Sequence, residues 1–165
     1  MAGIEHRVNT ADAVLPDELQ VHFSSFDYDD AWTLGCQLRS AAVERGLPIV
    51  IGVVHGQQRA FHTALPGSYP ENDHWLNRKI ATAQRYGRSS LDVLELFTST
   101  GRDFDTDSRL PHNEFAAAGG VLPIVVQRVG IVGFVGVSGL PHRDDHTFVD
   151  EQVELFRRSQ ISDPR

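Results

Sequence analysis

Apolar residues recur along this chain at two different periods. Alternating apolar positions over 19–26 indicate a short strand. A helical spacing of apolar residues follows over 27–46, where aspartates open the segment and a glycine ends it. Two β-branched or alternating runs, 49–54 and 59–65, are joined by the turn His55-Gly56-Gln57 and predict a β-hairpin.

The second half of the chain continues the alternation of helices and hairpins. Residues 98–112 are polar and rich in turn formers, so no element is expected there. The predicted elements are a helix from Asn72 or Asp73 to Tyr86, a helix opened by Ser89 with Asp92 three residues on, a short helical turn at 113–118, a hairpin of strands 121–126 and 131–137, and a helix over 143–158.

The order of elements is therefore strand, helix, hairpin, two helices, hairpin, helix. Hairpins require antiparallel pairing, so we expect an α+β fold in which helices pack on an antiparallel sheet. Residues 1–18 are expected to form a tail or a short helix, and 19–160 a single domain. The chain after Ser159 is expected to fray.

Composition narrows the class of protein. The chain has 165 residues, 41% of them hydrophobic, and a net charge of −7. No apolar run is long enough to cross a membrane, and an acidic balance argues against a broad nucleic-acid interface. Cys36 is the single cysteine, and the N-terminus lacks a secretion signal, so we expect a cytoplasmic protein. Nearly all positive charge is arginine, and Lys79 is the lone lysine.

The densest polar segment, 72–90, indicates an anion site. Arg78, Arg85 and Arg88 lie near the start of the third helix, where the N–H groups of Ser89 and Ser90 are free to hold a carboxylate or phosphate. An equally weighted alternative is that Ser89 only caps its own helix, while the arginines pair with local acids. The turn Ser138-Gly139 before the last helix is a second candidate anion site.

Other candidates for chemistry are sparser. His142 and His146 lie four residues apart and share a helix face, which is the spacing of two-histidine metal sites, although a solvated first helical turn explains them as well. Asp73, Asp145 and His146 are the acid–base candidates. Ser138 is interpreted as a turn residue rather than a nucleophile. The sequence contains no phosphate-binding loop and no dinucleotide-binding motif.

Several of these motifs occur together in one family. They are Asn72-Asp73-His74-Trp75 with Arg78-Lys79, Tyr86-Gly87-Arg88-Ser89-Ser90, Gly119-Gly120 with the following strand, and Val137-Ser138-Gly139-Leu140-Pro141 with Asp145-His146. In this order they resemble an uncharacterised branch of the haem-degrading-domain superfamily, which includes the GlcG/HbpS-like proteins. The resemblance implies a profilin-like or PAS-like fold with a five-stranded antiparallel sheet, assembly as dimers or higher homo-oligomers, and binding of haem in some relatives.

The chain also departs from that pattern. Ala118 stands where a histidine is expected before Gly119-Gly120, and Phe134 and Gly136 stand where threonines are expected. Three hypotheses follow: a binding protein for a small ligand, either haem or another anionic metabolite; an enzyme of haem breakdown or small-acid metabolism; or an oligomeric interaction protein. The expected ligand-binding residues are Asn72, Trp75, Arg78, Lys79, Tyr86, Arg88, Ser89, Ser138, Gly139 and His146.

Overall fold

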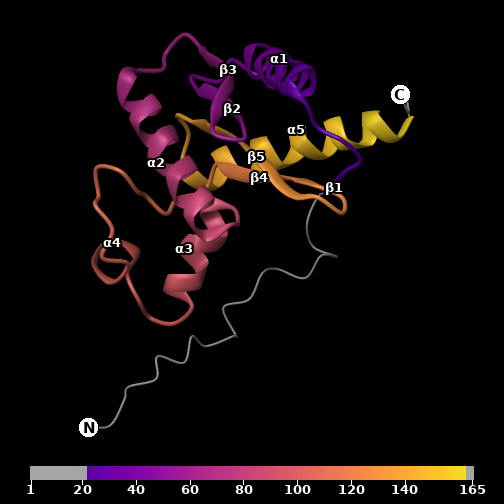
Figure 1. Cartoon of the computed structure of the whole chain (residues 1–165). Coiled ribbons are helices and arrows are strands. Elements are labelled where there is room, and N and C mark those ends of the chain that lie inside the picture. Colours follow the sequence, from indigo (N-terminus) through magenta and orange to yellow (C-terminus); the bar gives the residue numbers. More distant parts are fainter. Residues whose placement is uncertain (1–21, 163–165) are drawn as a thin grey trace, which may run out of the picture.

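The computed structural model describes residues 22–162, which form a five-stranded sheet covered by helices (Figure 1). Two elements precede the first hairpin, whose strands are followed by three helices, the second hairpin and a long final helix. In chain order the elements are β1 (His22–Phe23), α1 (Tyr28–Glu44), β2 (Val50–His55), β3 (Gln58–Ala64), α2 (Pro70–Tyr86), α3 (Ser90–Thr98), α4 (Phe104–Asp107), β4 (Val121–Val126), β5 (Gly130–Ser138) and α5 (His142–Ser162).

The sheet has the strand order β1-β4-β5-β2-β3 and is mixed. The two hairpins and the β2–β5 pair are antiparallel, as predicted, and Val50 of β2 lies opposite both Ala64 of β3 and Ser138 of β5. The prediction of a wholly antiparallel sheet is wrong, because β1 pairs with β4 in parallel. Helix α1 separates β1 from β2, so no tight turn constrains the direction of β1.

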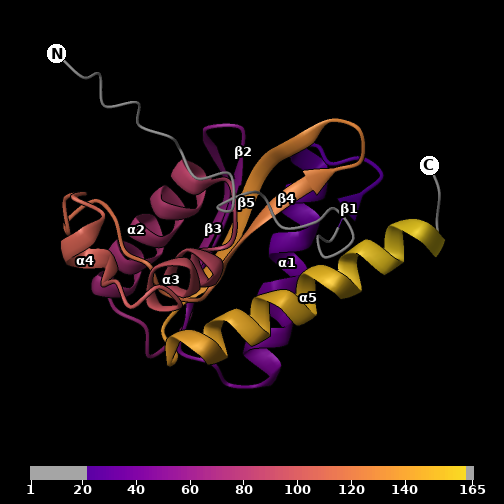
Figure 2. The same cartoon turned by 90° about the horizontal axis from the view of Figure 1, so that it is seen from below.

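Two hydrophobic layers hold the helices to the sheet. Helices α1 and α5 cover one face, and α2 lies on the other with α3 beside it (Figure 2). The α2 layer contacts inward-facing residues of three strands, Val50, Val121 and Phe134 among them. A third, smaller cluster joins α3 to α4 through Phe97 and Phe104. These layers fix the N-terminal half of α2 above the end of β5.

Local sequence signals account for most helix ends. The Asp27 side chain accepts the N–H of Asp30, and the Asp30 carboxylate accepts the N–H of Asp27, so α1 begins with a reciprocal cap. Ser89 caps α3, as predicted, through the N–H of Asp92. Helix α2 begins earlier than the predicted Asn72 or Asp73, because Pro70 occupies its first position, where a missing N–H costs nothing.

The remaining predictions concern the polar stretch before β4 and the two ends of the chain. The polar stretch 98–112 contains the short helix α4, which was not expected. The helical turn expected at 113–118 begins earlier, because the Phe115 N–H bonds the Pro111 carbonyl oxygen at 3.0 Å. Helix α5 continues to Ser162 instead of fraying after Ser159. The expected tail at 1–18 and the first part of the strand expected at 19–26 lie outside the described residues. Within residues 22–162, no helix combines the length and apolar character needed to span a membrane.

Candidate functional site

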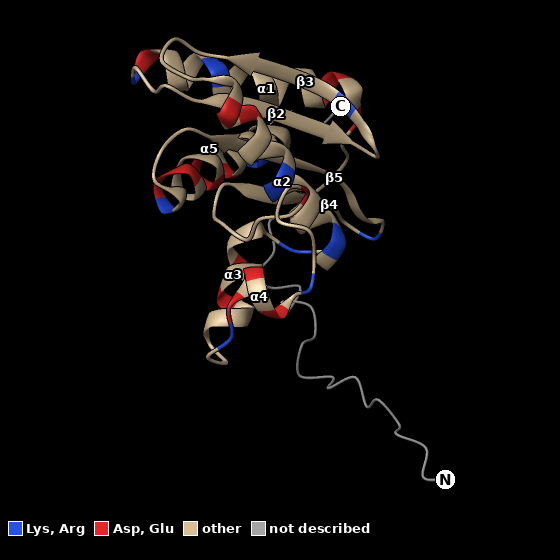
Figure 3. Cartoon of the chain, turned by 90° about the vertical axis from the view of Figure 1, so that its left-hand side faces the viewer, with Lys and Arg blue, Asp and Glu red and all other residues tan. Residues whose placement is uncertain are grey.

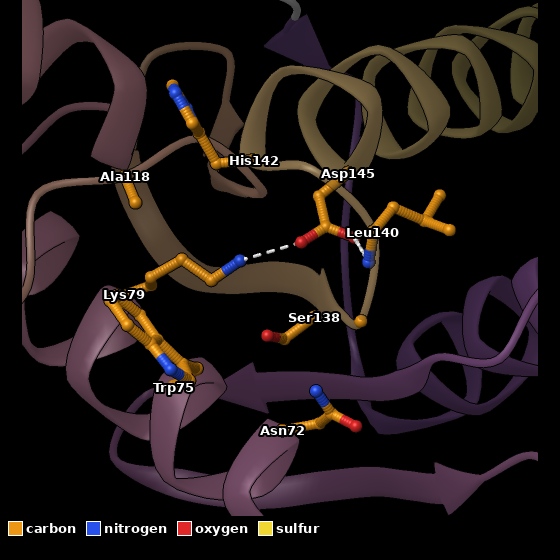
Figure 4. A pocket seen from close by; sticks show the side chains of 9 residues that line it. Asn72, Trp75, Lys79, Ala118, Ser138, Leu140, His142 and Asp145 are labelled. Carbon is orange, nitrogen blue, oxygen red and sulfur yellow. Dashed lines mark hydrogen bonds and ion pairs between the residues drawn. The ribbon is translucent and has the colours of Figure 1, made fainter. Parts of the chain in front are cut away.

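A cavity of about 290 Å³ lies where α2, the end of β5 and the start of α5 meet (Figure 4). Segments far apart in the sequence contribute its walls. Its lining consists of Asn72, Trp75 and Lys79 from α2, Ala118 from the loop before β4, Ser138, Gly139 and Leu140 from the end of β5 and the turn that follows, and His142 and Asp145 from α5. We call this space the α2–α5 cavity.

Three residues of α2 reach the cavity because they share one stripe of the helix. Asn72, Trp75 and Lys79 are spaced i, i+3 and i+7, which places them on the same face. The Asn72 side-chain oxygen accepts the N–H of Tyr69 at 2.8 Å, and this bond fixes the orientation of the amide. Its NH₂ group therefore faces away from Tyr69 and toward Ser138 (Figure 4).

Lys79 is buried, and its ammonium group is fully coordinated. Nζ donates to the carbonyl oxygens of Gly119 at 3.0 Å and Val137 at 2.9 Å, and to Asp145 Oδ2 at 3.1 Å. Three acceptors around one nitrogen require three N–H donors, so this geometry belongs to the protonated amine. Lys79 consequently cross-links α2 to the loop before β4, to β5 and to α5, and it has no lone pair to act as a nucleophile or base.

Asp145 occupies the anion site expected at Ser138-Gly139. Its Oδ1 accepts the N–H of Leu140 at 3.0 Å, and its Oδ2 lies 3.1 Å from Lys79 Nζ. Burial raises the pKa of Asp145 and lowers the pKa of Lys79, while their mutual attraction opposes both shifts. The protein's own carboxylate thus takes an N–H of the turn that had been expected to hold an anion.

The two histidines of α5 bind the glycine pair before β4. His142 Nδ1 accepts the N–H of Gly119 at 3.1 Å, and His146 Nδ1 accepts the N–H of Gly120 at 3.4 Å. A backbone N–H can only donate, so both imidazoles carry their proton on Nε2 in the neutral form. No group of three or more His, Cys, Asp or Glu in residues 22–162 is arranged to hold a metal ion, so the predicted histidine pair has no third ligand there.

Gly120 has a conformation and a location that exclude a side chain. Its φ of 125° is disfavoured for any residue with a Cβ. A Cβ at this position would lie 2.6 Å from Lys79 Nζ and 2.8 Å from the Val137 carbonyl oxygen. The backbone of Gly120 therefore packs directly against the buried ammonium group.

Ser138 presents a hydroxyl group to the cavity. It is 4% exposed, and its hydroxyl has no hydrogen-bond partner among the described residues. Figure 4 shows the hydroxyl pointing into the space between Asn72 and the side chains of Trp75 and Lys79. A hydroxyl that faces a cavity and has no protein partner is free to bond a ligand or water that enters there.

Trp75 forms an aromatic wall on the helix side of the cavity. The Arg78 guanidinium lies 4.2 Å from the centre of the indole ring and also contacts Glu71 at 3.4 Å. Arg78 therefore buttresses Trp75 from outside the cavity and does not line it.

The remaining predicted site residues lie elsewhere. Tyr86 packs against Phe97 and Phe104, with ring centres 6.2 Å apart in each case, and burial raises its pKa. Ser89 caps α3, and Ser90 Oγ accepts the N–H of Val121 at 3.1 Å. The structure therefore gives both serines structural bonds of the kind that the alternative interpretation assigned to Ser89.

Asp73, Arg85 and Arg88 also lie outside the cavity lining. Asp73 accepts a bond from His62 Nε2 at 2.6 Å on the β3 side of α2. Arg85 lies 5.8 Å from the centre of the Phe115 ring. In the view of Figure 3, acidic and basic residues are interspersed along the helices.

Sequence reasoning missed the coordination of Lys79 and the roles of the two histidines. Two signals were available. Asn72, Trp75 and Lys79 share a helical stripe that excludes Arg78 and Arg85, and a lone lysine in an arginine-rich chain indicates a position that needs a compact ammonium group. Ala118 and Leu140, which also line the cavity, were not among the expected site residues.

The sequence matches one protein family over most of its length. A family model described as haem degrading protein HbpS-like matches residues 26–154. A UPF0303 protein of Streptomyces avermitilis is 44% identical over 139 residues, which cover 84% of this chain and 85% of that protein.

Solved structures confirm the architecture. The crystal structure of the Ybr137w protein is similar with a TM-score of 0.77 and 27% identity, over 86% of this chain and 83% of that one. The PduOC:haem complex is similar with a TM-score of 0.65 over 79% of this chain and 94% of that one, and at 16% identity it indicates the fold alone.

Proposed function

Because the chain belongs to the HbpS-like family, we propose that it is a binding protein for a small molecule, which occupies the α2–α5 cavity. The observation that carries this proposal is the Ser138 hydroxyl, which points into the cavity and has no hydrogen-bond partner in the described part of the chain. A volume of about 290 Å³ suits a ligand at or below the lower end of the usual pocket range of roughly 300–1,000 Å³.

The cavity favours binding over catalysis. Lys79 and Asp145, the two ionisable groups deepest in its wall, are engaged with each other and with backbone groups. A general acid or base must be free to exchange a proton with a substrate. Asp73 and His146, the other acid–base candidates, do not line the cavity and have partners of their own.

The family description raises haem as the ligand, but the residues of this cavity do not fit an iron tetrapyrrole. Haem iron commonly takes a side-chain axial ligand, and its propionates are anionic. His142 lines the cavity, but its Nδ1 accepts the N–H of Gly119, so its Nε2 carries a proton and has no lone pair for iron. Lys79, the cation in the wall, is already neutralised by Asp145.

Native mass spectrometry of protein purified without added ligand tests the proposal. We expect a non-covalent mass excess that is lost in an Ala118→Phe variant, because Ala118 lines the cavity and the larger side chain takes up part of its volume. The thermal midpoint of the variant serves as the control for folding. A mass excess that persists in Ala118→Phe contradicts the proposal.

Haemin titration tests the tetrapyrrole alternative separately. We expect no saturable Soret shift that depends on the cavity. A shift that is present in the native protein and absent in both Ala118→Phe and His142→Asn overturns our assignment of a smaller ligand.

We further propose that the chain forms homo-oligomers, as the family resemblance implies. Strand β3 is an edge strand of the sheet, and edge strands can pair with a second copy. Trp32, which is 60% exposed, lies beside this strand with its ring 5.4 Å from that of Phe61. Sedimentation equilibrium is expected to give a multiple of 18.3 kDa that Trp32→Glu lowers, and a monomer at all concentrations contradicts this proposal.

A further inference from the structure

The charged side chains in the wall of the α2–α5 cavity neutralise each other. The lining contains one basic and one acidic side chain, Lys79 and Asp145, each 2% exposed, and they pair with each other. Both members of the pair make further hydrogen bonds: Lys79 donates to two carbonyl oxygens, and Asp145 accepts the N–H of Leu140. A charged group entering this space would lose water without gaining an opposite charge, which is costly in a poorly solvated site.

The unsatisfied polar groups of the cavity are neutral. The Ser138 hydroxyl has no partner in the described residues, and the Asn72 NH₂ group has none there either, because the bond to Tyr69 uses the amide oxygen. The two groups point toward a common space (Figure 4). They offer N–H and O–H donors to one acceptor atom of a ligand.

The third element of recognition is aromatic. The Trp75 indole lines the cavity, while the Arg78 guanidinium covers part of its surface from outside. A flat ligand gains stacking or edge contact with such a ring in addition to area burial.

From these observations we propose that the ligand is uncharged where it enters the cavity: a small planar molecule whose carbonyl, amide or ring-nitrogen acceptor lies between Ser138 and Asn72. This inference rests on the proposed function, and it replaces the anionic ligand expected from the sequence. A charged portion of a larger ligand is accommodated only outside the cavity.

Three isosteric probes separate the charge classes: benzamide (neutral), benzoate (anion) and benzamidinium (cation). Binding is measured at pH 7 by ¹H–¹⁵N spectra of the full chain, from the indole N–H signal of Trp75, which a Trp75→Phe variant assigns, and from the Asn72 side-chain NH₂ signals. We expect benzamide to bind at least about tenfold more tightly than either ion, a difference of about 1.4 kcal/mol.

Variants of Asn72 sharpen the test. Asn72→Asp keeps the oxygen that accepts the Tyr69 N–H and replaces the NH₂ donor with a carboxylate oxygen. We expect this variant to lose benzamide and to prefer benzamidinium. Asn77→Asp, the matched control, introduces the same charge on the same helix outside the cavity lining and should preserve the preference for benzamide.

The possible failures are distinguishable. Tighter binding of benzoate that Asn72→Asp abolishes leaves the cavity as a ligand site but overturns the inference of an uncharged ligand. No response of Trp75 or Asn72 to any of the three probes also overturns the inference. The proposed function fails separately, when the native mass excess is unaffected by Ala118→Phe.

Discussion

Lys79 Nζ lies 3.1 Å from Asp145 Oδ2, and the two side chains are 2% exposed, so the wall of the cavity is built on a buried ion pair. The pair joins residues 66 positions apart in the sequence. Burying two charges costs free energy that their attraction repays only when the remaining donors and acceptors are also satisfied, as they are here. The pair therefore holds the site in one arrangement, and the stabilisation that it contributes is lost when either partner is removed.

Removing one partner is expected to be far more costly than removing both. Lys79→Met should lower the free energy of unfolding by about 3–5 kcal/mol, because it leaves a buried carboxylate without a cation. Lys79→Met combined with Asp145→Asn should cost less than the sum of the two single changes, as measured by urea unfolding. Additivity within about 0.5 kcal/mol contradicts the coupling. The exposed pair Arg45–Glu151 is the control, and Arg45→Met should cost about 1 kcal/mol or less.

Arginine is not expected to replace the lone lysine. The three acceptors of Lys79 surround a single nitrogen, whereas a guanidinium presents its donors in a planar fork of larger volume. Lys79→Arg should therefore destabilise the protein nearly as much as Lys79→Met in the same unfolding measurement, although charge is retained. A Lys79→Arg protein as stable as the native one would show that charge alone is required.

The sequence predicted those parts of the fold that depend on interactions between residues close together in the chain. Hydrophobic periods located α1, α2, α3 and α5 and both hairpins, and the caps at Asp27 and Ser89 are contacts between residues three apart. The direction of β1 was missed because a two-residue strand carries no local signal that fixes whether it runs parallel or antiparallel to its neighbour. Its pairing with β4 depends on tertiary packing.

The sequence indicated which segments form the site, but it did not indicate which contacts the individual residues make there. The sequence motifs shared with the family singled out the segments 72–79 and 138–146. In the structure, both segments contribute residues to one cavity. The roles of individual residues depended on which groups satisfy one another. Asp145 fills the expected anion site, and Arg78 lies behind Trp75, because buried polar groups take the nearest available partners.

Gly120 is expected to tolerate no side chain. Gly120→Ala combines a φ of 125° with a Cβ placed against Lys79 Nζ and the Val137 carbonyl, so it should cost several kcal/mol, from roughly 1–2 for the backbone and 1–3 for overpacking. Gly130→Ala is the matched control, because its φ is 103° and no atom lies within 4 Å of its Cβ. Equal losses of thermal stability in the two variants would contradict the packing role of Gly120.

The pairing of His146 with Gly120 predicts a dependence of stability on pH. Burial lowers the pKa of His146 below its usual 6.5, although Asp150, Asp92 and Glu95 partly oppose the shift. The unfolded chain therefore binds a proton at higher pH than the folded chain does, and stability present above pH 6.5 is lost as the pH falls through the folded pKa.

His146→Asn removes this titration and keeps an acceptor for the Gly120 N–H. Between pH 7 and 5, the free energy of unfolding should fall less steeply in the variant than in the native protein, by up to about 1.4 kcal/mol per pH unit. The two proteins are compared at pH 8 as the control, where the imidazole is neutral in both states. Parallel pH profiles would contradict the assignment.

Ser90 provides a last test, because its hydroxyl stabilises the sheet rather than a ligand. Ser90 Oγ accepts the N–H of Val121 at 3.1 Å, and both residues are fully buried. Ser90→Ala should cost about 1–3 kcal/mol, since it leaves a buried N–H without an acceptor. Ser89→Ala removes a helix cap and should cost about 1 kcal/mol. Neither change should alter benzamide binding. Binding of benzoate that is lost in Ser90→Ala at unchanged stability would restore the anion site that the sequence first indicated.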